Sequence, residues 1–103
     1  MPTFEHAGLG LRLAVKDDLR QGDLEKWAAA IREFEPKGMN TSNREFYGAQ
    51  LRGALKAEIA VAGIPGTDAL RPLDVAAIDP RWVNWFGLKL AALYRGYDEI
   101  PPE

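Results

Sequence analysis

Near the N-terminus the hydrophobic residues alternate with residues of other kinds. Leu9, Leu11, Leu13 and Val15 fall at every second position, and this period of two is typical of a half-buried β-strand. A single strand leaves backbone hydrogen-bonding groups unpaired, so it needs a partner. Three partners are open: the segment before the strand, the stretch from Leu70 to Ile78, or a strand of another subunit.

The hydrophobic spacing then changes to the three and four residues of an amphipathic helix. We expect this first helix to begin near Asp23, whose carboxylate is placed to act as the N-cap. Pro36 and Gly38 are expected to end it, because proline cannot continue a helix and glycine suits its end. The apolar face comprises Leu24, Trp27, Ala28, Ile31 and Phe34.

A second helix is predicted from about Asn43 to Ala62. Ser42 and Glu45 have the spacing of a capping box, in which each side chain satisfies a backbone N–H at the helix start. Gly63 is suited to a left-handed helix end. The residues from Ile64 to Ile78 contain several prolines and glycines, which predicts a packed loop or a short strand.

A third helix is predicted from Pro80 to about Arg95, with Asp79 as its N-cap and Pro80 in its first turn. Its hydrophobic residues surround most of the helix instead of forming one face. Such a helix must be covered on more than one side, either as the central helix of the domain or by a partner. Val83, Phe86, Leu90, Leu93 and Tyr97 share one side, whereas Trp82, Trp85, Leu88, Ala92 and Tyr94 occupy the rest.

Length and composition predict one domain over residues 1–103, mainly α, with three helices and a short N-terminal β-strand or hairpin. Residues 1–8 are expected to form an extended N-terminal segment and residues 98–103 a C-terminal tail. The net charge of -2 does not attract nucleic acid or anionic lipid. No stretch approaches the roughly 20 apolar residues of a membrane span. We therefore expect a cytoplasmic protein without nucleic-acid or membrane partners.

The residues offer little catalytic chemistry. The chain has no cysteine, and its one histidine, His6, is expected to lie in a poorly ordered end. No nucleophile, base and orienting group can be assembled, and no histidine and cysteine cluster has metal-ligand spacing. Arg44, Arg52 and Lys56 on the second predicted helix are interpreted as a solvated face. We expect no enzymatic activity, no cofactor and no metal.

Tryptophan is the residue type that points to function. Trp27 and one of Trp82 and Trp85 are expected in the core, which is too small to take all three together with the neighbouring aromatic residues. Tryptophan is enriched at the residues that dominate protein–protein binding. The predicted partner-binding residues are Trp82, Trp85, Leu88 and Tyr94.

Three segments carry a resemblance to a known family: Gln21–Trp27 at the first helix, Asp79–Gly87 at the third, and Ile100–Glu103 at the tail. In layout and in these residues the chain resembles the small tail assembly chaperones of long-tailed bacteriophages. The resemblance implies a non-enzymatic protein of the host cytoplasm, often oligomeric. Such a chaperone coats the hydrophobic tape-measure protein before the tail tube polymerises, and is then shed.

A second hypothesis is a structural component of the phage particle, such as a head–tail connector or a tail-associated protein. The third predicted helix would then pack permanently against neighbouring copies, and the strand from Leu9 to Val15 would add to the sheet of another subunit. The two hypotheses differ in whether the protein is present in purified particles.

Overall fold

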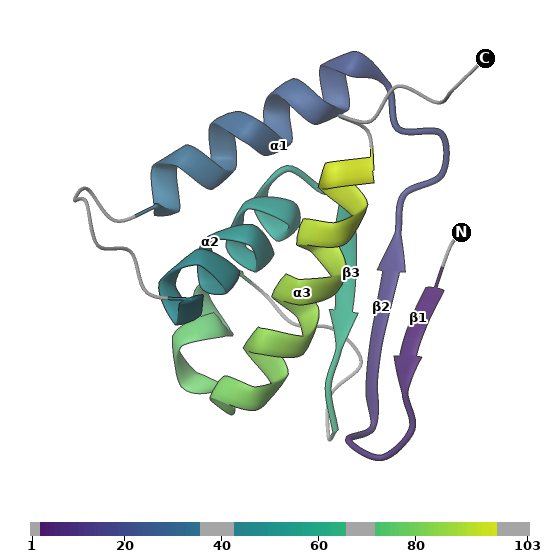
Figure 1. The fold of residues 1–103 in the computed structure, drawn as a ribbon, viewed down its shortest axis with the longest axis vertical. Helices are drawn as coiled ribbons and strands as arrows, with labels where there is room; N and C mark the ends of the chain where they lie inside the picture. The colour runs from purple at the N-terminus through teal and green to yellow at the C-terminus, as the bar shows by residue number, and fades with distance from the viewer. Residues whose placement is uncertain (1–2, 36–42, 66–71, 97–103) are drawn as a thin grey trace.

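The computed structural model describes residues 3–35, 43–65 and 72–96, which form three helices packed on one side of a small antiparallel sheet (Figure 1). The predicted fold class, mainly α with a small β part, is confirmed. The elements in chain order are β1 (Thr3–His6), β2 (Leu11–Val15), α1 (Gln21–Phe34), α2 (Asn43–Lys56), β3 (Ala60–Gly63), the 3-10 helix η1 (Pro72–Ala77) and α3 (Pro80–Gly96).

The predicted strand, β2, lies in the middle of a sheet with the order β1-β2-β3 and pairs within the chain on both sides. Phe4 of β1 lies opposite Leu13, which in turn lies opposite Ala62 of β3, and these three residues face the helices. Arg12 and Val61 lie on the other face and are exposed. The alternation predicted for β2 is confirmed, because its buried residues are Leu11, Leu13 and Val15.

Helix α2 ends earlier than predicted, at Lys56, because a Schellman motif stops it there. The N–H of Ile59 donates to the carbonyl of Ala54 at 2.9 Å, and the N–H of Glu58 donates to the carbonyl of Leu55 at 3.3 Å. These are the two hydrogen bonds that define the motif. Glu58 takes the left-handed position with φ 60, which glycine usually occupies.

The prediction that α2 reaches Ala62 and ends at Gly63 is therefore wrong. Residues Ala60–Gly63 instead form β3, a partner for β2 that the sequence did not indicate. Ala60 and Ala62 face the core and are buried, so their small side chains bring the helices close to the sheet.

The connection between β3 and α3 also differs from the prediction. Residues Pro72–Ala77 of the stretch expected to be a loop or a strand form the 3-10 helix η1. Val75 anchors η1, with 3% of its surface exposed. Residues 66 to 71 of that stretch lie outside the described residues.

The start of α1 differs in detail from the prediction. The N-cap is Arg20, and Asp23 lies in the first turn, where its carboxylate accepts hydrogen bonds from the Arg20 N–H at 3.0 Å and from Lys16 Nζ at 2.8 Å. These two hydrogen bonds, the backbone one first, lower the pKa of Asp23. Asp23 thus stabilises the helix start without being its N-cap. Pro36, Gly38 and Ser42, assigned to helix ends, and the tail at 98–103 lie outside the described residues.

Asp79 caps α3 as predicted. Its Oδ1 accepts a hydrogen bond from the Arg81 N–H at 2.9 Å, and its Oδ2 lies 2.7 Å from Arg81 Nη2. The side-chain and backbone hydrogen bonds from Arg81 lower the pKa of Asp79 from 3.8.

Because the folded-state pKa of Asp79 is depressed, this carboxylate contributes stability that is fully present above pH 3.8 and is lost as the pH falls through the lower, folded value. In Asp79→Asn the amide keeps a capping oxygen but carries no charge. We expect the variant to show a smaller loss of melting temperature than the wild type between neutral pH and the acid side of that value. If thermal unfolding at a series of pH values shows the same loss of melting temperature in acid for the variant and the wild type, this role of Asp79 is contradicted.

Helix α2 lies between α1 and α3, and glycines allow both neighbours to approach closely (Figure 1). A Cβ built on Gly53 would lie 2.9 Å from the backbone nitrogen of Ile31 on α1. One built on Gly87 of α3 would lie 2.7 Å from the Cα of Tyr47 on α2. The buried interior between these elements is filled by Trp27, Phe86, Leu13, Leu51, Ile59, Leu90 and Val15.

Candidate functional site

The three tryptophans divide into one fully buried residue and two partly buried ones. Trp27 has 0% of its surface exposed, which confirms its place in the core. Trp82 and Trp85 pack against the core with one side and meet solvent with the other. The prediction that one of the two would be buried is wrong, because both are only partly buried.

Trp82, Trp85 and Leu88 follow one another at intervals of three residues along α3, and we call them the α3 stripe. Residues three apart lie on neighbouring positions of a helix surface, so the three side chains form a continuous ridge. Leu88 is 51% exposed, as much as any large hydrophobic side chain among the described residues. The structure thus brings together three of the four predicted binding residues.

Tyr94, the fourth predicted residue, lies elsewhere. It is nine residues beyond Trp85, and at about 100° per residue this spacing places it on the opposite side of the helix. Its ring packs edge-on against Trp27, with the centroids 4.9 Å apart. Tyr94 also lines a hollow of about 180 Å³ beside Gln50, a residue only 6% exposed whose Oε1 has no hydrogen-bond partner.

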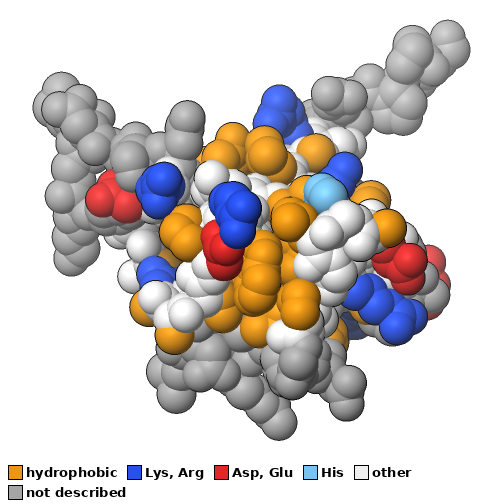
Figure 2. Space-filling view, turned by 90° about the horizontal axis from the view of Figure 1, so that it is seen from below, with side chains coloured by type: hydrophobic (Ala, Val, Ile, Leu, Met, Phe, Trp, Pro, Cys, Tyr) orange, Lys and Arg blue, Asp and Glu red, His pale blue; other side chains and the backbone are white. Residues whose placement is uncertain are grey.

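Strand β1 borders the α3 stripe. The rings of His6 and Trp85 meet edge-on with centroids 5.8 Å apart. Lys89 Nζ lies 5.8 Å from the Trp85 ring and 6.0 Å from the Phe4 ring, within the range of cation–π attraction. Figure 2 shows hydrophobic side chains gathered around the histidine on this face of the molecule.

His6 is a part of this surface that sequence reasoning missed. The N–H of Leu9 lies 3.2 Å from His6 Nδ1, within the turn between β1 and β2, so the imidazole is held in place. The expectation that His6 lies in a poorly ordered end is wrong. Only the register of β1 against β2, which places His6 opposite Leu11 on the face toward α3, reveals its position.

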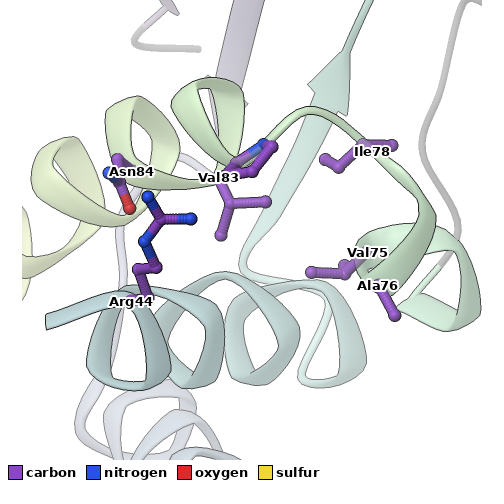
Figure 3. A pocket seen from close by; sticks show the side chains of 7 residues that line it. Arg44, Val75, Ala76, Ile78, Val83 and Asn84 are labelled. Carbon is purple, nitrogen blue, oxygen red and sulfur yellow. The ribbon is translucent and has the colours of Figure 1, made fainter. Parts of the chain in front are cut away.

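A separate hollow of about 150 Å³ lies between the start of α2, η1 and the start of α3. Its apolar walls include Val75, Ile78 and Val83, and Figure 3 shows Arg44 and Asn84 pointing toward one another at one end of it. Asn84 Oδ1 is buried without a hydrogen-bond partner. Arg44 belongs to the row that the sequence indicated to be a solvated face, and it is indeed exposed.

The described residues contain no group of three or more histidine, cysteine, aspartate and glutamate side chains placed to hold a metal ion. The carboxyl groups with a lowered pKa, Asp23 and Asp79, both lie at helix starts, and Asp79 precedes Trp82 of the α3 stripe by three residues. None of the described helices has the length and apolar character needed to cross a membrane.

The fold and this surface define a small, mainly α protein that exposes aromatic and aliphatic side chains along one helix. Comparison of the chain with protein-family models, with curated proteins and with solved structures finds no match to any of them.

Proposed function

We propose that this protein is a non-enzymatic chaperone of phage tail assembly that binds the hydrophobic tape-measure protein through the α3 stripe. The observation that carries the proposal is the ridge of partly buried Trp82 and Trp85 and exposed Leu88 on a chain with a net charge of -2. An apolar ridge on a charged, soluble body is what a chaperone for a hydrophobic partner needs.

The shape of the α3 stripe suits a helical partner. Its first and last members are six positions apart, which corresponds to about 9 Å along the helix axis at 1.5 Å per residue. An oblique ridge of residues three apart fits the groove between side chains of a second helix. The partly buried tryptophans have two rotatable bonds each and are already packed against the core, so binding costs them little side-chain entropy.

The size of the α3 stripe favours transient binding. A stable protein interface buries about 800 Å² on each partner, more than three half-exposed side chains supply. A chaperone that is shed needs an interface of this weaker kind. Several copies along one long partner would each add a small contribution, in keeping with the oligomeric form that the resemblance implies.

The alternative is a structural component of the particle, a head–tail connector or a tail-associated protein. The observation that favours it is the position of β1 and β3 at the two edges of the sheet, where a strand of a neighbouring copy would extend it. A component is stoichiometric in purified particles, whereas a chaperone is absent from them.

Leu88→Ser tests the proposal against a matched control, Val61→Ser. Both side chains are 51% exposed, but Val61 lies on the outer face of the sheet. Burying a fully exposed leucine side chain contributes about 1.5 to 3 kcal/mol; Leu88 is already half-buried, so losing it should weaken partner binding about three- to tenfold. Val61→Ser should leave binding unchanged.

The measurement is affinity capture of each tagged variant from cells that produce the protein, with mass spectrometry of the bound proteins. We expect the wild type and Val61→Ser to retain a very long, helical, hydrophobic protein that Leu88→Ser retains in a clearly smaller amount. Recovery of tail-tube or capsid subunits alone, or equal recovery by both variants, would overturn the proposal.

A further inference from the structure

The hollow at Arg44 and Asn84 combines an apolar interior with unmatched polar groups at one end. Its walls include Val75, Ile78 and Val83, and its volume of about 150 Å³ equals that of an engineered apolar cavity that holds one benzene-sized group. One branched or aromatic side chain therefore fills it.

Arg44 supplies a positive charge beside these walls. It lies in the first turn of α2, where the unpaired backbone N–H groups of a helix start add to the positive potential. No ion pair of Arg44 exists among the described residues. A guanidinium with this freedom binds a carboxylate by paired, charge-assisted hydrogen bonds.

Asn84 supplies the second polar group. Its Oδ1 is buried without a partner, and such an atom is costly unless a donor reaches it. Figure 3 shows Arg44 and Asn84 pointing toward one another at one end of the hollow, so a ligand whose carboxylate pairs with Arg44 brings its neighbouring atoms close to this oxygen. A ligand that satisfies both residues carries an N–H next to its carboxylate.

We infer that this hollow binds the C-terminal residue of a polypeptide with an apolar side chain. The side chain enters between Val75, Ile78 and Val83, the terminal carboxylate pairs with Arg44, and the backbone N–H of the same residue donates to Asn84 Oδ1. An internal peptide segment lacks the carboxylate, and a simple fatty acid lacks the N–H. The inference stands apart from the α3 stripe, since Leu88 takes no part in it.

The probes are N-acetyl-leucine, its neutral amide, and isovalerate, which has the same branched carbon body and a carboxylate but no N–H. Each is titrated to tens of millimolar into the whole chain while amide NMR signals are followed. We expect N-acetyl-leucine to give saturable shifts at Ile78, Val83 and the Asn84 side chain, and to bind about tenfold more tightly than the amide or isovalerate.

Three variants complete the test. Arg44→Gln should weaken binding of N-acetyl-leucine about tenfold, whereas Arg12→Gln, on the outer face of the sheet, should not. Ala76 is exposed and lines the hollow, so the larger side chain of Ala76→Leu should occupy the hollow and weaken binding of N-acetyl-leucine. Asn84→Ala should remove the preference for N-acetyl-leucine over isovalerate.

The inference would be overturned if the wild type bound the amide or isovalerate as tightly as N-acetyl-leucine. NMR shifts confined to other parts of the chain would overturn it as well. These outcomes do not depend on Leu88. Failure here and failure of the proposed chaperone function are therefore distinguishable.

Discussion

Replacing Trp27 with alanine is expected to destabilise the protein by about 3 to 5 kcal/mol, the usual result of truncating a fully buried aromatic side chain. Trp27 lies completely inside the core, and its ring packs against Tyr94 of α3 at 4.9 Å between centroids. It therefore joins α1 to α3 as well as filling volume. A small domain has only about 5 to 15 kcal/mol of net stability, so this one change takes up much of it.

Urea unfolding followed by circular dichroism measures the effect. Trp27→Phe is the control: it keeps most of the ring volume and removes the indole Nε1, which is buried without a hydrogen-bond partner. We expect the phenylalanine variant to lose clearly less stability than the alanine variant. A loss below about 1 kcal/mol for Trp27→Ala would show that this residue is not central to the core.

Gly87→Ala is expected to cost about 1 to 3 kcal/mol or more, as overpacking of a close contact does. The added methyl group would lie 2.7 Å from the Cα and 2.8 Å from the carbonyl oxygen of Tyr47. Since these are backbone atoms, no side-chain rotation relieves the clash, and α2 and α3 must move apart. Phe86 and Leu90, buried next to this contact, then lose packing as well.

Gly48→Ala is the matched control for Gly87→Ala, and its expected effect on stability is the opposite. It is also a helical glycine, but a Cβ built there meets nothing within 4 Å. Alanine is favoured over glycine inside a helix by about 0.5 to 1 kcal/mol, so this variant should be more stable than the wild type. Thermal unfolding of the two variants, measured side by side, compares their changes in stability. Equal effects of both would contradict the close approach of α2 and α3 at Gly87.

The parts of the fold that the sequence predicts are those with local signals. Asp79 and Pro80 mark the start of α3 because capping and the proline ring act within one turn. The end of α2 carries no such signal: Glu58 occupies a left-handed position that normally indicates glycine. Strand β3 then depends on pairing with β2, which lies about 45 residues earlier in the chain, and spacing alone does not reveal that contact.

The candidate site likewise has a part that local spacing predicts and a part that depends on the fold. Trp82, Trp85 and Leu88 share one helix, so their common surface follows from spacing alone. The contribution of His6 requires the strand register, and the separate hollow requires α2 and α3 to bring Arg44 beside Asn84. The same spacing already places Tyr94 on the opposite side of the helix from Trp85, and the fold adds its contact with Trp27.

Hydroxyl-radical footprinting of the captured complex tests the central claim most directly, because it measures the solvent accessibility of individual side chains. Oxidation of Trp82, Trp85 and Leu88 is predicted to fall when the partner is bound. Phe46, which is 37% exposed on α2, is the internal control and should be oxidised equally with and without the partner. Unchanged oxidation of the α3 stripe, with protection of Phe46 or of the outer sheet face instead, would contradict the account.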